Sequence, residues 1–580
     1  MKKSIRMVAL FLVALFTVLF ISGCSFGMQS DAPTMPKKTE NQGGDVTKHP
    51  TEEVKKDKSQ LNIYSYDGGY GSDWLYEVKK RFEEEFKDVS FEEGKTGVQI
   101  MITPNKSAIT ADSIKHDSYE IYFIEGCEDY HILRNKGCFE DLTSVVTSVS
   151  PYDNKTIESK LTDEQKAYWG VEESDEIHYY CLPHYEGYYG IIYNVDLFDN
   201  KGFYFADDKS EGDFILPGDF EARSAGPDGK KGTSDDGLPA TYEEFFMLCD
   251  YIKEQSIVPL IWTGEVYSQY VTSLTNSLFA DAEGKDQTML NFTFDGLATD
   301  LGSIVGGEFV KDANPLTITG LNGYELARQE GKYQAIKFTE TITKNKDYHN
   351  TEAFSQLSQL GAQERFLKAS YGIGDGINDP CAMLIDGVWW ENEAKSTFAS
   401  MVNSFGNDAS KNVRRFGFMY LPKANESKIG SKNVLCDVMN SKCFVKAGLN
   451  DDMKALALTF VQFVNSDESL REFTVSTGAP KAFKYELTDD DMAKLSPYAK
   501  SLLEYRKTAD IIYPVSQNEI FVNNASKFDR INGLFGSKVG GKTLQTPVKG
   551  MRENNTVTTN DYFTGIYDLF REFTFWKEIK

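Results

Sequence analysis

The sequence predicts an α/β fold, and three features of its first folded stretch indicate it. Residues 61–66 alternate apolar and polar side chains, as a half-buried strand does, and 98–102 and 119–124 are further runs of strand length. Between the first two runs, residues 74–86 carry apolar side chains at helical spacing. Strand, helix and strand at this spacing are typical of parallel βαβ units, whose ligands bind at the carboxyl ends of the strands.

The length and composition indicate a soluble globular protein with more than one domain or lobe. The chain has 580 residues, of which 41% are apolar and 26% charged, and a chain this long exceeds what one compact core usually holds. Its formal charge of −25 would repel a phosphate backbone, which argues against a nucleic-acid partner.

The alternation of strands and helices continues along the chain. We expect a helix over residues 241–252, because Thr241 can cap it and Glu244 three residues later would complete a capping box. Further strands are predicted over 258–262, 380–385 and 416–421, and a strong helix over 453–464.

The N-terminus predicts export. Lys2, Lys3 and Arg6 precede an apolar run over residues 7–21, which is short for a membrane span and long enough for an export signal. The run ends in Ile-Ser-Gly-Cys24, which resembles the lipobox of bacterial lipoproteins. The resemblance implies a signal peptide over 1–23 and a lipid on the thiol of Cys24. The alternative is an ordinary signal peptide or anchor with an incidental cysteine.

Residues 25–59 lack an apolar period and are rich in Ser, Thr, Pro, Lys, Glu, Asp and Gly, so 24–59 is predicted to be a lipidated cysteine followed by a disordered tether.

The seven cysteines after Cys24 form no CxxC pair. Because their number is odd, at least one is unpaired, and buried free thiols or a single disulfide are both compatible with the sequence.

Most chemistry-bearing motifs lack the context that they need. Residues 536–543 fit the P-loop pattern G-x4-G-K-[ST], but a poor strand precedes them and Pro547 and Gly550 follow. A P-loop needs a strand before it and a helix after it to hold phosphate, so we interpret this match as coincidence. The sequence contains no H-E-x-x-H and no G-x-S-x-G.

The insert at residues 226–237 is rich in glycine and carboxylates. Asp228, Asp235 and Asp236 could wrap a structural Ca²⁺. The insert lacks the EF-hand order and contains Lys230 and Lys231, so an ordinary acidic loop is the alternative. No other cofactor is expected.

Aromatic and acidic residues gather just after predicted strands or at helix starts. Sugar rings present C–H faces that stack on aromatic rings, and their hydroxyls need charged or amide partners. The alternative for each Trp alone is core packing. The candidate ligand-binding residues chosen on this ground are Asp67, Trp74, Glu125, Tyr185, Glu186, Trp262, Glu265, Tyr267, Asp386, Trp389 and Trp390.

Several segments, in order, resemble the maltose-binding-protein-like family, the extracellular solute-binding proteins of carbohydrate ABC importers. The segments are 61–74, 119–137, 182–198 with its Tyr-Asn-Val-Asp-Leu-Phe turn, 238–246, 382–389, 418–422 and 476–480 with its Thr-Gly-Ala-Pro sequence. Together they span about residues 61–485. Residues 486–580 extend beyond the usual core of this family, and the 226–237 loop is an insert.

The resemblance implies a two-lobed, class II-like, hinge-connected α/β fold with a C-terminal helical extension. Lobe 1 would comprise 60–187 and 425–490, and lobe 2 would comprise 188–424 and 491–580, with crossings near 185–193, 421–435 and 490. Trp389 falls on the family's sugar-stacking position, and Asp67 and Glu125 match ligand-facing positions. Tyr267 or Tyr270 would offer an aromatic ring from the second lobe, and Trp390 is an addition to the pattern.

The function implied is that of a monomeric, lipid-anchored binding protein on the outer face of a bacterial cell membrane. It would close its lobes on a carbohydrate, bind no nucleic acid, and deliver the sugar unchanged to permease subunits. Two alternatives stay open: a surface glycoside hydrolase or lyase, and a binding protein for a peptide or polyamine.

Overall fold

The computed structural model describes residues 52–107, 109–125, 130–210, 212–264, 269–369, 380–528, 533–553 and 555–577. The predicted signal peptide and most of the tether lie outside these residues. Residues 43–580 form one compact unit. Its two larger sheets define what we call the first and the second lobe.

The first lobe is built on a five-stranded sheet in the order β2-β1-β3-β16-β6. Its strands are β1 (Ser59–Tyr66), β2 (Val98–Asn105), β3 (Ile121–Ile124), β16 (Lys442–Val445) and β6 (Leu182–Pro183). β1 is parallel to β2 and β3, as the strand–helix–strand pattern predicts, while β16 is antiparallel to β3. The late strand β16 therefore ties the C-terminal part of the chain into the first lobe.

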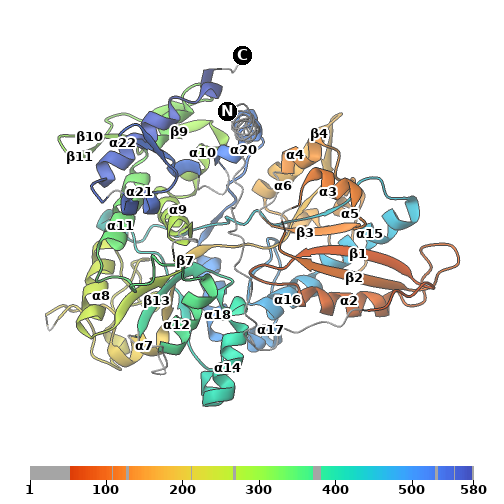
Figure 1. Ribbon diagram of the computed structural model, residues 1–580, viewed down its shortest axis with the longest axis horizontal. Helices are drawn as coiled ribbons and strands as arrows, with labels where there is room; N and C mark the ends of the chain where they lie inside the picture. Colours follow the sequence, from red (N-terminus) through yellow and green to blue (C-terminus); the bar gives the residue numbers. More distant parts are fainter. Residues whose placement is uncertain are drawn as a thin grey trace, which may run out of the picture. The chain divides into compact units, whose positions relative to one another are not determined.

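Three helices pack together beside this sheet (Figure 1). They are α2 (Asp73–Glu85), α15 (Asp451–Val464) and α16 (Asp467–Thr477). The predicted apolar stripe of α2 is buried through Trp74, Leu75, Val78 and Phe82. The shorter helices of this lobe are α3 (Ala111–His116), α4 (Tyr130–Asn135), α5 (Thr143–Thr147) and α6 (Asp163–Trp169), and β4 (Gly170–Glu173) and β5 (Glu176–Tyr179) form a hairpin.

The second lobe is built on a four-stranded sheet in the order β14-β7-β13-β8. Its strands are β14 (Phe416–Phe418), β7 (Tyr189–Asn194), β13 (Cys381–Gly387) and β8 (Val258–Trp262). β13 is parallel to β8 and antiparallel to β7, and every residue of β7, β13 and β8 is buried. Strands that are buried on both faces appear in the sequence as short runs of mostly apolar residues, without polar alternation.

Helices and small hairpins complete the second lobe. The helices are α7 (Val195–Lys201), α8 (Tyr242–Glu254), α9 (Gln269–Glu283), α10 (Lys285–Thr293), α11 (Glu330–Lys344), α12 (Gln359–Ala369), α13 (Trp390–Glu393) and α14 (Lys395–Phe405). The hairpins pair β9 (Gly296–Ala298) with β12 (Leu316–Ile318) and β10 (Gly302–Val305) with β11 (Glu308–Lys311).

Only one of the two hydrogen bonds of the predicted capping box of α8 forms. Thr241 Oγ1 accepts a hydrogen bond from the backbone N–H of Glu244 (3.3 Å). The Glu244 carboxylate accepts from the backbone N–H of Ala240 (2.7 Å) instead of that of Thr241. The carboxylate therefore ties down the residue before the cap, which still fixes the start of the helix.

The C-terminal segment continues across both lobes. α17 (Asp489–Lys494) packs on α16, whereas α18 (Pro497–Thr508) packs on β14 of the second lobe. Between the lobes, β15 (Val434–Cys436) and β17 (Asp510–Ile512) pair in parallel. The remaining helices are α19 (Glu519–Asn523), α20 (Ala525–Phe528), α21 (Pro547–Glu553) and α22 (Thr559–Phe570), of which α21 and α22 pack on α11.

The P-loop-like segment is a β-hairpin. β18 (Ser537–Val539) and β19 (Lys542–Leu544) are antiparallel, and Gly540 and Gly541 form the turn between them with φ of +57° and +79°. This turn receives no helix N-terminus, so the prediction that the motif is coincidental is confirmed.

Among the described residues, no disulfide joins the six cysteines, and all six are buried: Cys138, Cys181, Cys249, Cys381, Cys436 and Cys443. Of the two compatible readings, the structure therefore supports buried thiols for these six. Within the described ranges, no helix combines the length and apolar character that a bilayer crossing requires.

Candidate functional site

A cleft of about 500 Å³ lies between the two lobes. The first lobe contributes the β1–α2 loop, which starts at Asp67, and the strand β2. The second lobe contributes the start of α12 and residues of α13 and α14, including Asn392 and Glu393. Asp67 follows β1 directly and Glu393 lies shortly after β13, so both occupy the carboxyl ends of strands, where α/β proteins bind ligands.

Two ion pairs neutralise most of the charge along the cleft. Lys79 Nζ lies 2.5 Å from a carboxylate oxygen of Glu52 within the first lobe. Lys395 Nζ lies 2.6 Å from a carboxylate oxygen of Asp73 and thereby joins the second lobe to the first. Both acids are partly exposed, so these pairs orient the side chains more than they stabilise the fold.

Gly69, in the β1–α2 loop, is held by the second lobe through its backbone. Its carbonyl oxygen accepts a hydrogen bond from Asn392 Nδ2 (2.9 Å). Its φ of +42° lies in the left-handed region, and a Cβ there would lie 3.2 Å from Cγ of Trp389. Only glycine allows this approach without strain.

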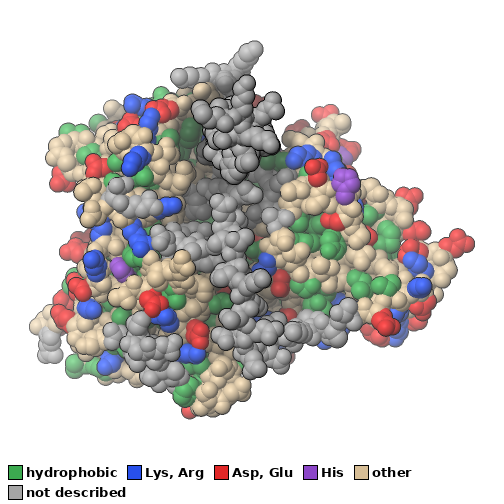
Figure 2. Space-filling view, viewed as in Figure 1, with side chains coloured by type: hydrophobic (Ala, Val, Ile, Leu, Met, Phe, Trp, Pro, Cys, Tyr) green, Lys and Arg blue, Asp and Glu red, His purple; other side chains and the backbone are tan. Residues whose placement is uncertain are grey.

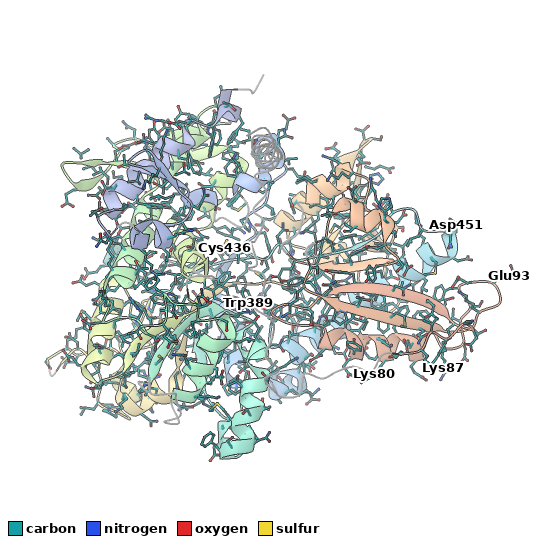
Figure 3. The ribbon with its side chains drawn as sticks, in the orientation of Figure 1. Lys80, Lys87, Glu93, Trp389, Cys436 and Asp451 are labelled. Atoms are coloured by element: carbon teal, nitrogen blue, oxygen red, sulfur yellow. The ribbon has the colours of Figure 1, made fainter. Side chains whose placement is uncertain are left out.

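Trp389 packs against three glycines from three separate segments. Besides Gly69, a Cβ on Gly187 or Gly387 would lie within 3.1 Å or less of its ring. The Trp389 side chain is 3% exposed, and Figure 3 shows it beside β7 and β13. Its ring is surrounded by the protein itself in this conformation, and it is separated from the cleft by the loop that carries Gly69.

Aromatic rings from both lobes surround Trp389. Tyr189 lies edge-on to it with ring centroids 5.0 Å apart, and Tyr70 of the β1–α2 loop lies edge-on at 6.4 Å. Tyr270, one of the two predicted second-lobe aromatics, packs on Tyr189 at 5.0 Å. Tyr185 packs edge-on against Tyr70 at 4.7 Å. The cluster is therefore continuous across the lobe boundary.

Glu125 follows β3 and lies next to this cluster. Its carboxylate accepts a hydrogen bond from the hydroxyl of Tyr185. Two predicted residues from different segments thus form one polar contact at the boundary. Burial and the Glu125 charge together raise the pKa of the Tyr185 hydroxyl well above its usual value.

Asp386, near the end of β13, shares one amide with Glu393. Gln363 Nε2 donates to Asp386 Oδ2 (3.0 Å) and to Glu393 Oε2 (2.9 Å). Asp386 is 1% exposed and Gln363 is fully buried. Burial, and then the Glu393 charge, raise the pKa of Asp386 well above its usual value.

Glu186 is fully buried in the first crossing between the lobes. Arg506 of α18 binds both of its carboxylate oxygens, with Nε–Oε2 at 2.6 Å and Nη2–Oε1 at 2.8 Å. The hydroxyls of Tyr513 and Tyr188 also donate to this carboxylate. All these contacts are internal, so Glu186 joins the first crossing to the C-terminal segment.

Asp437, in the second crossing, lies near Glu186. It accepts hydrogen bonds from the backbone N–H groups of Gly187 (3.0 Å) and Met439 (3.1 Å). Burial raises its pKa to about 7. The crossings are therefore held together by buried carboxylates.

Three predicted tryptophans lie in hydrophobic cores. Trp74 packs edge-on against Phe123 and Phe473 in the first lobe, each at 5.2 Å. Trp262, at the end of β8, is fully buried and contacts His349 and Phe354. Trp390 is fully buried and contacts, among others, Phe416 and Tyr498. None of the three lines the cleft.

The carboxylates of the 226–237 insert accept hydrogen bonds from their own loop. Asp235 accepts from the N–H of Asp228 (2.9 Å) and from Thr233 Oγ1 (2.6 Å), and Asp236 accepts from the N–H of Gly232 (2.7 Å). Over the described residues, no group of three or more His, Cys, Asp or Glu side chains could hold a metal ion. The predicted residues Glu265, Tyr267 and Cys24 lie outside the described residues.

Sequence reasoning did not single out Gln363, Asn392, Glu393 or Lys395. The last three follow the predicted strand 380–385 by only a few residues, so the rule that ligands bind after parallel strands could have found them. Gln363 gave no such signal, because it reaches the site through the packing of α12 on β13.

Among solved structures, the chain is similar to a "Chitin oligosaccharide binding protein" at 14% identity and a TM-score of 0.52, which covers 89% of this chain and 99% of that one. It is also similar to "Maltose bound T. maritima MalE3" at 12% identity and a TM-score of 0.52, over 88% and 99% of the two chains. For "SBP RafE in complex with raffinose" the identity is 14%, the coverage 88% and 100%, and the TM-score 0.47.

No protein-family model and no curated protein matches the chain. At these identities the similarity to solved structures shows the fold. The chain has the two-lobed α/β fold of periplasmic binding proteins such as MalE.

Proposed function

We propose that this protein is the carbohydrate-capturing component of an ABC importer, and that it binds a sugar between its lobes without changing it. The observation that carries the proposal is the cleft of about 500 Å³ walled by both lobes. Its volume is in the range of small-molecule sites, and Asp67 and Glu393 place a carboxylate on each wall.

The chemistry of the cleft and its surroundings suits a sugar. Carboxylates and amides pair with hydroxyl groups, and the aromatic cluster around Trp389 lies directly behind the β1–α2 loop. The two similar structures with a TM-score of 0.52 are a chitin oligosaccharide binding protein and a maltose-bound MalE3. This similarity supports a saccharide ligand here.

The contacts of Gly69 and Lys395 across the cleft support capture by closure. They connect the two lobes through short polar contacts, which a hinge motion can make and break together. A ligand that touches both walls would shift the balance toward the closed arrangement.

Asp386 and Glu393 do not have the arrangement of a glycosidase pair. A glycosidase needs two carboxyl groups on either side of the bond that it cuts, roughly 5–10 Å apart. Asp386 and Glu393 are instead bonded to the same amide nitrogen, so they lie on one wall. This geometry argues against a hydrolase built on this pair.

The proposal includes the location predicted from the N-terminus. A lipid on Cys24 would hold the protein on the outer face of the membrane, and the tether would let it reach a permease. Labelling with an azide-bearing palmitate tests this part: wild type should be labelled, and Cys24→Ala should not.

Thermal-shift melting with a panel of oligosaccharides, amino acids and short peptides tests the binding function. A ligand at about 100 times its Kd adds about 2.7 kcal/mol, which is a measurable shift. One class of glycan should raise the melting temperature, and Asp67→Ala should reduce that shift. Asp88→Ala, at an exposed position of the first lobe, is the matched control. A panel in which only peptides or amino acids raise the melting temperature would overturn the sugar assignment.

A further inference from the structure

Two carboxylates of the second lobe are held side by side without a cation. Gln363 uses both hydrogens of its amide to bind Asp386 and Glu393. Within the part of the chain that the structure describes, neither carboxylate makes an ion pair with Lys, Arg or His. Glu393 lines the interlobe cleft, and Asp386 is buried behind it.

Such a pair is electrostatically unfavourable as it stands. Burial penalises a charged carboxylate, and a second negative charge nearby adds to the penalty. Burial raises the pKa of both Asp386 and Glu393, and the Glu393 charge adds to the rise at Asp386. Either a proton or a positive charge supplied from the cleft would relieve the repulsion.

The lysines that line the cleft do not supply this positive charge. Lys79 and Lys395 are occupied by Glu52 and Asp73. Lys106 is exposed beyond the end of β2, and its charge acts on Glu393 without forming an ion pair.

The opposite wall adds a further acceptor. The Asp67 carboxylate has no cationic partner among the described residues and lines the same cleft. Behind the wall, Gln363 Oε1 is buried and accepts no hydrogen bond from any described residue. Groups that can only accept hydrogen bonds are therefore in excess around the cleft.

We propose that the interlobe cleft selects a solute that carries a protonated amine, with the amine bound at Glu393 and favoured by the charges of Asp386 and Asp67. The proposal rests on the proposed function, because it uses the same cleft. An ammonium group supplies three N–H donors and a positive charge, which matches the acceptors and the charge found here. An amino sugar with a free amine and a polyamine share this chemistry.

Calorimetric titration with three probes distinguishes these sources. The probes are a tetramer of β-1,4-linked glucosamine, its fully N-acetylated counterpart and spermidine. The glucosamine tetramer should bind at least about tenfold more tightly than the N-acetylated one, since the acetyl group removes the charge. The difference should shrink between about 0.02 M and about 0.5 M salt, where screening is strong.

Each outcome separates this inference from the proposed function. Equal or tighter binding of the N-acetylated tetramer would overturn the amine inference and leave sugar capture intact. Binding of spermidine alone would uphold the amine inference and overturn sugar capture. If none of the three binds, the amine inference is overturned, and the wider glycan panel then decides sugar capture.

Glu393→Gln tests the residue that we assign to the amine. The variant keeps the size of the side chain and should weaken glucosamine binding roughly ten- to a hundredfold, the range for a lost charged hydrogen bond. It should weaken binding of the N-acetylated tetramer by a smaller factor, so that the preference for the glucosamine tetramer shrinks. Glu364→Gln is the matched control. Glu364 is next to Gln363 in the sequence, is partly exposed and pairs with Lys368.

The salt dependence of wild type keeps the test independent of the variant's folding. If Glu393→Gln does not fold, a preference for the amine-bearing tetramer that is insensitive to salt would still contradict the proposal. An unchanged affinity in a folded Glu393→Gln would contradict it as well.

Discussion

Replacing Arg506 with Met should destabilise the protein through a buried carboxylate rather than through lost packing. Glu186 is fully buried, and Arg506 supplies two of its short hydrogen bonds, at 2.6 and 2.8 Å. Met has a long apolar side chain that can fill much of the same space. The variant therefore leaves Glu186 with the hydroxyls of Tyr188 and Tyr513 and without a counter-charge.

The expected loss is about 3 kcal/mol of unfolding free energy. Removing one partner of a buried ion pair typically costs about 3–5 kcal/mol. The Arg506 side chain is 26% exposed and that of Glu186 is not exposed at all, so water partly screens the pair and the lower end of the range applies. Neutralising the acid as well, in Glu186→Gln with Arg506→Met, should recover part of the loss.

Urea denaturation followed by circular dichroism measures the change as a shift of the midpoint. Lys507→Met is the matched control, because this neighbour on α18 is 65% exposed, and its effect should stay within about 0.5 kcal/mol. A loss of less than about 1 kcal/mol in Arg506→Met, or a double variant less stable than Arg506→Met alone, would contradict a destabilising buried charge at Glu186.

Three further predictions concern the lobe contact and two buried ionisable groups. Gly69→Ala should lower the melting temperature more than Gly94→Ala. Both glycines have positive φ, but only the Cβ added at position 69 would crowd another atom, Cγ of Trp389 at 3.2 Å. Equal losses of melting temperature would contradict this. Burial raises the pKa of Asp437 to about 7, so its contribution to stability is full below about pH 4 and is lost as the pH rises through 7. The melting difference between wild type and Asp437→Asn should therefore fall from pH 5 to pH 8, and a constant difference would contradict it. Burial lowers the pKa of Lys481 to about 7, so wild type should gain stability from pH 7 toward about 10; Lys481→Met should lack this gain, and melting curves that shift equally with pH would contradict it.

Local patterns in the sequence predicted the architecture well. The alternation at residues 61–66 and the stripe over 74–86 correspond to β1 and α2 within one or two residues. Both patterns arise because the burial of a strand or helix face repeats along the chain. The P-loop match could be dismissed for the same reason, since the neighbouring residues did not have the period of a strand or a helix.

The site was harder to predict, because its members come together only in the fold. An aromatic residue after a strand can point into a core or toward a ligand. Trp262 and Trp390 pack in the core, whereas Trp389 contacts Tyr70 of the first lobe. Gln363 and Glu393 are 30 positions apart in the sequence and meet because α12 packs on β13. Such contacts leave no periodic signal in a single sequence.

Charge distribution was predictable only as a total. The net charge of −25 argues against a nucleic-acid partner. It does not predict where the charges lie, and Figure 2 shows acidic and basic side chains interspersed over the visible face of the first lobe. Within the described part of the chain, Asp67 and Glu393 have no ion-pair partner, because the neighbouring Lys79 and Lys395 pair with Glu52 and Asp73. The sequence alone does not predict these pairings.

We propose that the interlobe cleft holds one carbohydrate and leaves it intact. Equilibrium dialysis with the glycan that gives the largest melting shift tests this claim most directly, when the ligand is recovered and its length is measured after a long incubation. We expect saturation at one glycan per chain, recovery of the glycan at its original length, and loss of binding in Asp67→Ala. Shortened glycans would identify an enzyme instead, and saturation that is unaffected by Asp67→Ala would place the ligand outside this cleft.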